Sequence, residues 1–169
     1  MVNSQEHTDV YRFKGWVVIL LPMVALFLQA YLPLLLPGAA MLDFALLATL
    51  YFAFGRRNQA AGLLLGAVIG LVQDSLGPGP IGVFGMVKTL IGYAASSLGV
   101  RLDVENPLTR LLLVFAFYYI HLGLFLGLER FLLERAVNPP GLDSVVAALV
   151  NAIAGVVIFQ LLDRLRQRE

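Results

Sequence analysis

Six long apolar runs, separated by short breaks rich in Gly, Pro or charge, constrain this chain more than any other feature. Each run holds 16 to 20 residues, which as an α-helix extends about 24–30 Å and matches the hydrocarbon thickness of one bilayer. The period of two that marks barrel strands is missing from the runs. The sequence therefore predicts an all-α integral membrane protein with six transmembrane helices. The predicted spans are residues 15–32, 39–54, 59–76, 81–99, 109–128 and 144–162.

Composition agrees with a membrane protein and excludes other classes. Hydrophobic residues make up 59% of the 169 and charged residues only 14%, and the mean hydropathy is +0.83, whereas a soluble domain carries more charge. A net charge of +1 offers no basic field for nucleic acid. Because the chain has no cysteine, disulfide frameworks and thiol-ligated metals are excluded.

The order of polar and apolar segments predicts one membrane domain, residues 15–162, between two cytoplasmic tails, 1–14 and the basic 163–169. The first apolar run is too long for the core of a cleaved signal peptide, so we expect a retained first span. The breaks between runs are too short for a separate soluble domain.

The basic residues predict the orientation of the spans in the membrane. Nine lie on one side of the predicted spans and two on the other, and cytoplasmic loops are enriched in Lys and Arg. Both termini are therefore predicted to be cytoplasmic. The nine are Arg12, Lys14, Arg56, Arg57, Arg101, Arg110, Arg164, Arg166 and Arg168, and the two are Arg130 and Arg135.

Two charged residues flank the Gly/Pro turn between the third and fourth runs. Asp74 ends one run, and Lys88 lies inside the next, where a charge costs about 2.5–3.5 kcal/mol unless it is paired or turned inward. Asp74 has three interpretations: an ion-pair partner of Lys88, a turn or cap residue, or a proton or ligand site. Lys88 has a simpler alternative, in which its side chain extends to the membrane surface.

Small residues form a stripe on each of these two predicted helices. Gly62, Gly66 and Gly70 are spaced four apart, with Gln73 and Asp74 on nearly the same face. Such stripes allow close helix contact, so the two runs are expected to pack as an antiparallel hairpin, or to reserve one face for a partner helix or ligand. The second stripe, which follows Gly82 of the turn, comprises Gly85, Lys88, Gly92, Ser96 and Gly99.

Other polar residues in the spans have structural interpretations. Asn151 lies in the middle of the sixth run and is predicted to form interhelical hydrogen bonds. His121 is expected to be a satisfied interior histidine rather than a metal ligand, since the sequence around it has no second ligand at suitable spacing. Known catalytic and phosphate-binding motifs are missing from the sequence. We therefore predict a binding or organising role without catalysis, cofactor or metal.

Segment 70–93 resembles the MreD family of bacterial rod-shape-determining membrane proteins. The family pattern is a small residue before an amide-Asp pair, a Gly-containing turn, and an apolar helix that closes near a Tyr. Chain length, six short-looped spans and a basic tail also match, although Lys88 is not part of the pattern. The matching residues are Gly70, Gln73, Asp74, Gly82, Gly92 and Tyr93.

The resemblance implies a non-enzymatic scaffold or regulatory subunit of the cell-elongation complex. It implies binding to MreC, a single-span membrane protein, and work with the actin-like MreB, RodA and its transpeptidase in lateral peptidoglycan synthesis and rod shape. The candidate intramembrane polar or partner-binding residues are Asp74, Lys88, Gln73, Asn151, Gly82, Gly85, Gly92 and Gly99. Contacts with membrane lipids are expected, a homodimer is compatible with the resemblance, and nucleic acid is not expected.

The family is also similar to the six-helix substrate-binding subunits of energy-coupling-factor transporters. The alternative function is therefore a substrate-binding membrane subunit of a transporter for vitamin-type small molecules. Those subunits carry an Ala-x-x-x-Ala patch on the first helix, whereas here Ala25 is followed by Gln29. This departure counts against the transporter interpretation.

Overall fold

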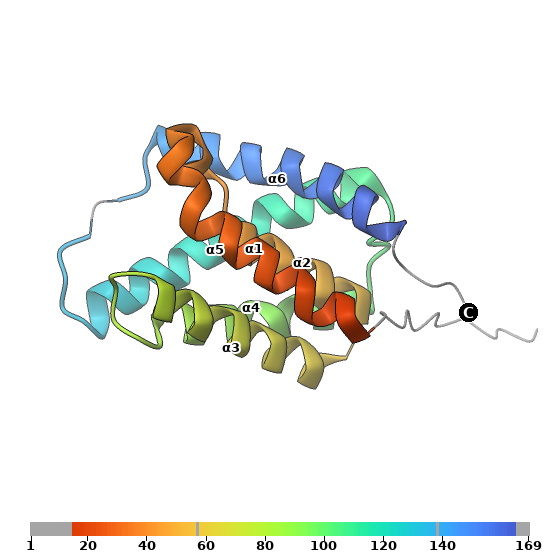
Figure 1. The fold of residues 1–169 in the computed structure, drawn as a ribbon, viewed down its shortest axis with the longest axis horizontal. Coiled ribbons are helices and arrows are strands. Elements are labelled where there is room, and N and C mark those ends of the chain that lie inside the picture. Colours follow the sequence, from red (N-terminus) through yellow and green to blue (C-terminus); the bar gives the residue numbers. More distant parts are fainter. Residues whose placement is uncertain (1–14, 57, 138, 165–169) are drawn as a thin grey trace, which may run out of the picture.

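The residues that the structure describes form six α-helices and one short 3-10 helix (Figure 1). The structure, a computed structural model, describes residues 15–56, 58–137 and 139–164, and within these ranges it contains no β-strand. The predicted tail 1–14 and most of the tail 163–169 lie outside the described residues. In order, the elements are α1 (Gly15–Leu35), η1 (Pro37–Met41), α2 (Phe44–Arg56), α3 (Gln59–Leu76), α4 (Val83–Gly99), α5 (Pro107–Phe131) and α6 (Leu142–Asp163).

Four of the helices, α1, α3, α5 and α6, are long and apolar enough to cross a membrane. The largest departure from the predicted spans concerns the second one. α1 continues through Pro33 to Leu35, and the next segment forms η1, which starts with Pro37. α2 therefore begins at Phe44, not at residue 39, and has only 13 residues.

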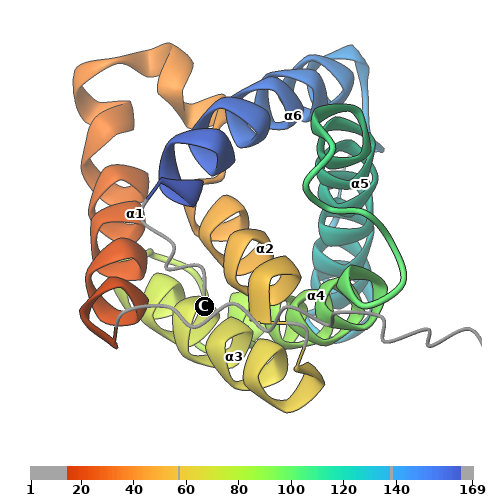
Figure 2. The same ribbon diagram turned by 90° about the vertical axis from the view of Figure 1, so that its right-hand side faces the viewer.

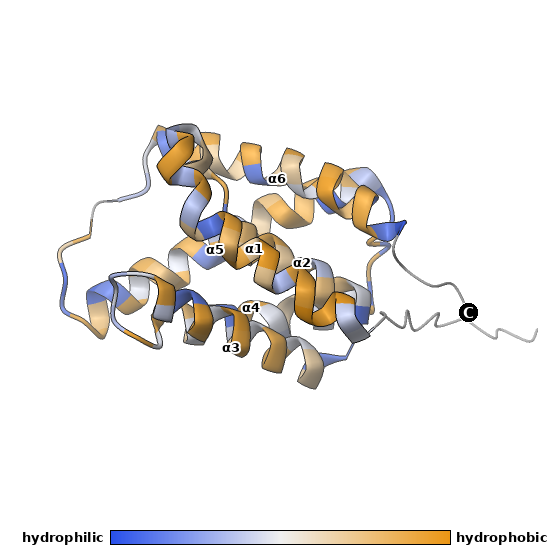
Figure 3. Ribbon diagram, in the orientation of Figure 1, coloured by the Kyte–Doolittle hydropathy of each residue, from blue (hydrophilic) through white to orange (hydrophobic). Residues whose placement is uncertain are grey.

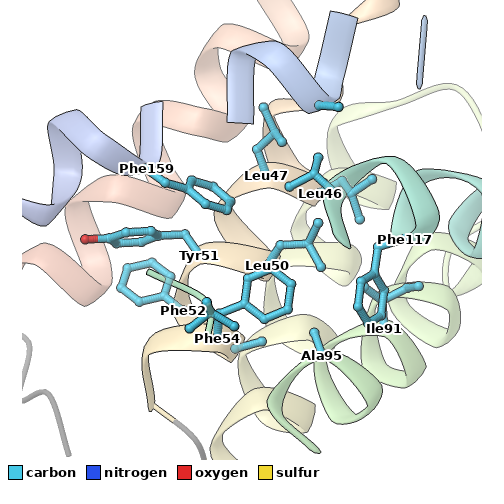
Figure 4. Close-up of a cluster of buried hydrophobic side chains, with 14 of the residues drawn as sticks. Leu46, Leu47, Leu50, Tyr51, Phe52, Phe54, Ile91, Ala95, Phe117 and Phe159 are labelled. Atoms are coloured by element: carbon cyan, nitrogen blue, oxygen red, sulfur yellow. The ribbon is translucent and has the colours of Figure 1, made fainter. Parts of the chain in front are cut away.

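α2 is the central helix of the molecule. Viewed from the end, α1, α3, α4, α5 and α6 surround it (Figure 2), and every residue from Ala45 to Gly55 is buried. Its aromatic side chains reach outward to its neighbours (Figure 4): the Tyr51 ring lies 5.4 Å from the Phe159 ring of α6, and the Phe54 ring lies 5.8 Å from the Phe117 ring of α5. A helix enclosed by protein is apolar on all faces, which explains why α2 lacks a polar side.

Hydrophobic residues predominate along the helices (Figure 3), and many large ones are exposed on the outside of the bundle. On α1, Ile19 is 67% exposed and Leu34 78% exposed, and in the most apolar parts of the four long helices only 17–33% of residues are buried. Such a surface is unfavourable in water and suits contact with lipid. The fold is therefore that of an integral membrane protein.

Successive helices run in opposite directions, so the described arginines collect at the ends of the bundle (Figure 1). Arg56, Arg101 and Arg164 lie at the end where α1 starts and α6 finishes. Arg110 is buried near this same end, where its Nη2 contacts Asp163 Oδ2 of α6 at 2.6 Å and its Nε donates to the Val104 carbonyl at 2.5 Å. We call the opposite end, where α1 meets η1 and α3 meets α4, the η1 end.

Candidate functional site

Asp74, the last buried residue of α3, caps the start of α4. Its Oδ2 accepts hydrogen bonds from the backbone N–H groups of Gly82 at 2.9 Å and Gly85 at 3.0 Å, and its Oδ1 accepts one from Phe84 at 3.0 Å. Three N–H donors satisfy a carboxylate well. Gly82 has φ = 107°, a conformation that favours glycine. Asp74 is thus the cap of the turn, and its interpretation as the ion-pair partner of Lys88 is wrong.

Lys88 forms its ion pair with Asp43, the residue just before α2. The distance from Lys88 Nζ to Asp43 Oδ2 is 3.3 Å, and the Lys88 side chain is fully buried. It points into the protein, so the alternative in which it extends to the membrane surface is wrong. A buried charge in a membrane protein is normally paired in this way, and the partner comes from a different segment of the chain than the sequence suggested.

His121 of α5 completes the polar cluster. Its Nε2 lies 3.2 Å from Lys88 Nζ and 3.7 Å from Asp43 Oδ2. An ammonium group only donates, so the tautomer with its proton on Nδ1 is the one whose Nε2 accepts from Lys88. Lys88 Nζ also lies 5.1 Å from the centre of the Phe84 ring. Within the described residues, no group of three His, Cys, Asp or Glu side chains could hold a metal ion.

Asn151 of α6 ties this cluster to the rest of the bundle. Its Oδ1 accepts a hydrogen bond from the Asp43 backbone N–H at 2.8 Å, and its Nδ2 donates to the carbonyls of Met41 at 2.7 Å and Ala147 at 2.8 Å. The predicted interhelical role of Asn151 is therefore confirmed. By holding the chain on both sides of Leu42, it fixes where the Asp43 carboxylate faces Lys88.

A cavity of about 210 Å³ adjoins the cluster. Gln29 of α1, Gln73 of α3 and Tyr118 of α5 line it together with Asp43 and His121. The sequence singled out Gln73 but did not connect it with Gln29, which lies on another helix. We call this space the polar cavity.

The glycine stripe of α3 packs directly against α4. A Cβ added at Gly66 would overlap the Lys88 carbonyl, and one added at Gly92 would overlap the Gly62 carbonyl. The predicted antiparallel hairpin is therefore confirmed. On α4, a Cβ at Gly99 would lie 3.1 Å from the Phe54 carbonyl oxygen of α2, so Gly92 and Gly99 have no room for a partner helix.

Two glycines of α5, Gly123 and Gly127, have open space where a side chain would lie. A Cβ added at Gly123 or Gly127 of α5 would meet no atom within 4 Å among the described residues. Both line a groove of about 780 Å³ between α3, α4 and α5, which we call the apolar groove. Gly85 also lies there, and a Cβ on it would meet only the flexible Leu71 side chain at less than 3.4 Å.

Sequence reasoning missed Asp43 because the search for a partner of Lys88 stayed within one turn of the chain. The available signal was an acidic residue inside the predicted span 39–54, where a charge requires a partner. Its contact with Lys88 joins positions 45 apart and depends on how α2, α4 and α5 pack.

Comparison with known proteins gives one match. The sequence model of a family described as "rod shape-determining protein MreD" matches residues 11–165 of the 169. No curated protein and no solved structure matches the chain, so the expected similarity to energy-coupling-factor transporter subunits has no support. Because the family match extends over nearly the whole chain and the fold is that of a membrane protein, this chain belongs to the MreD family of rod shape-determining proteins.

Proposed function

We propose that this protein is a non-enzymatic scaffold of the bacterial cell-elongation complex that binds the transmembrane helix of an MreC-like single-span protein in the apolar groove. Membership in the MreD family supports the role in rod shape. The apolar groove supports the proposed contact with the partner helix. Through this partner, the protein would act with MreB, RodA and its transpeptidase to support lateral peptidoglycan synthesis.

The groove has the features that a transmembrane helix requires. Gly123 and Gly127 lie one turn apart on α5 and are open, and small residues at this spacing let two helix backbones approach closely. The exposed side chains of Met86 and Leu90 on α4 supply an apolar wall. The glycines between α3 and α4, by contrast, are already filled by the neighbouring backbone.

We further propose six membrane crossings with both termini in the cytoplasm. The arginines at the end where α1 starts support this orientation, since cytoplasmic ends are enriched in Arg and Lys. The η1 end and the mouth of the apolar groove then face the periplasm, where a single-span partner could continue into a soluble domain. Reporter fusions after Arg101 and at Glu169 should report cytoplasm, and one at Pro139 should report periplasm. A periplasmic signal at Glu169 would refute the topology.

Cysteine cross-linking tests the docking site without interference, because the chain has no natural cysteine. Met86→Cys lies in the groove, whereas Ile153→Cys lies on α6, where Ile153 is 58% exposed. With an MreC-like partner that carries single cysteines along its span, Met86→Cys should cross-link at helical spacing and Ile153→Cys should not. Cross-links from Ile153→Cys alone would place the partner on α6. Cross-links from Met86→Cys only to a second copy would make the groove a homodimer face.

A steric test complements the cross-linking. Gly127→Leu should reduce recovery of the partner in co-purification about tenfold, which corresponds to about 1.4 kcal/mol, because the added side chain separates the helices. Gly15→Leu is the matched control, since Gly15 is a helical glycine that is also open but lies far from the groove. Equal recovery of the partner with both variants would remove the groove from consideration.

A further inference from the structure

The polar cavity has a feature that partner docking does not explain: buried hydrogen-bond acceptors without a donor. The carbonyl oxygens of Gln29 and Gln73 are both buried, and neither has a hydrogen-bond partner within the part of the chain that the structure describes. Both residues line the cavity, from α1 and α3. Buried polar atoms of native proteins are nearly always paired, so two unpaired acceptors around one space point to a missing donor.

The charges at the cavity are already balanced. Asp43 pairs with Lys88 at 3.3 Å, and His121 Nε2 lies 3.2 Å from the same Lys88 Nζ. An anionic ligand would be repelled by the carboxylate of Asp43, and a cationic ligand would compete with Lys88 for it. The site therefore favours an uncharged ligand.

The size of the polar cavity and the chemistry of its lining narrow the class of ligand further. The cavity of about 210 Å³ is large enough for several water molecules or for one small polyol. A hydroxyl group both donates and accepts, so it can satisfy either end of a glutamine amide. Ala40 and Met41 of η1 are exposed at the rim, which gives access from the η1 end.

We propose that the polar cavity binds an uncharged polyol about the size of one sugar ring, whose hydroxyl groups donate hydrogen bonds to Gln29 and Gln73. The polyol is either a free solute or the headgroup of a lipid that reaches the rim from the membrane. This inference does not depend on the proposed partner or on the apolar groove.

The test measures thermal unfolding of the full chain in phosphatidylcholine nanodiscs with two probes. Methyl glucoside in the buffer represents a free solute, and glucosyl diacylglycerol in the disc represents a headgroup. At least one probe should raise the wild-type Tm by about 4 °C, since a ligand that binds only the folded state stabilises it. The probe that raises the Tm shows whether the ligand is a free solute or a lipid headgroup.

Variants separate binding from structure. Gln29→Met with Gln73→Met keeps the side-chain length but removes both acceptors, so the shift caused by the probe should disappear while the Tm without probe stays level or rises. Ala40→Phe, which keeps both glutamines and blocks the rim, should also abolish the shift. Gln160→Met on the exposed face of α6 should retain it. No shift in the wild type with either probe, or an equal shift in the double variant, would mean that water alone fills the cavity and would overturn the proposal.

Discussion

Replacing Lys88 with Met while Asp43 remains should destabilise the protein by about 3–5 kcal/mol, because it leaves a buried carboxylate without its counter-charge. The two charged atoms lie 3.3 Å apart, and the Asp43 side chain is only 15% exposed. At that distance and an effective dielectric constant of about 20, the Coulomb attraction is about 5 kcal/mol before the cost of desolvation is subtracted. The Leu46 N–H that donates to Asp43 at 2.7 Å remains and offsets part of the loss.

Replacing Asp43 with Asn should also destabilise the protein, because the neutral amide can accept a hydrogen bond from Lys88 but no longer balances the charge of its buried ammonium group. The double variant removes both charges, and such neutral replacements are often tolerated. It should therefore be more stable than either single variant. The expected coupling free energy is about 2–3 kcal/mol.

The assay is a double-mutant cycle of reversible unfolding in detergent micelles, followed by circular dichroism. A second cycle between Lys88 and Asp74 serves as the control. The Asp74 carboxylate accepts hydrogen bonds from three backbone N–H groups, so its coupling free energy with Lys88 should stay below about 0.5 kcal/mol. A smaller coupling for Asp43 with Lys88 than for Asp74 with Lys88 would refute the assignment of the ion pair.

Three further predictions concern stability, measured by the same unfolding assay. Asp74→Ala should cost about 2–4 kcal/mol through loss of the α4 cap, with Asp74→Asn less damaging; equal costs would mean that the hydrogen bonds contribute little. Gly66→Ala should cost about 1–3 kcal/mol because its Cβ overlaps the Lys88 backbone, whereas Gly127→Ala should change stability by less than about 0.5 kcal/mol; a reversed order would contradict the helix packing. Arg110→Met should cost about 1–2 kcal/mol by releasing α5 from α6, and an unchanged stability would show that this contact is dispensable.

The helices and their closest contact could be predicted from the sequence because both depend on local spacing. The glycines at positions 62, 66 and 70 recur about once every helical turn. This spacing predicts that one face of α3 packs closely against a neighbouring helix. The boundary of the second span could not be found in this way. Hydropathy does not distinguish η1 from a turn of α-helix, and only the prolines at 33 and 37 hinted at the irregular stretch.

The candidate site was harder to predict because it is assembled from distant segments. Asp74 and Lys88 are neighbours across one turn, yet the backbone N–H groups of α4 satisfy Asp74 first. The true partner, Asp43, comes close only when α2 occupies the centre of the bundle. Sequence spacing indicates that Lys88 needs a partner, but tertiary packing decides which one.

The short α2 has a consequence for how the bilayer meets the protein. Its 13 residues extend about 20 Å, well short of a hydrocarbon layer of about 30 Å, so in the proposed six-crossing topology the stretch from η1 to Asp43 would lie below the membrane surface. Non-helical backbone at that depth persists only where protein or a wet cavity satisfies its polar groups. Asn151 supplies part of this by bonding both Met41 and Asp43. In that topology the second crossing would combine the short α2 with an irregular stretch held by the interior of the bundle, while Lys88 stays enclosed by protein.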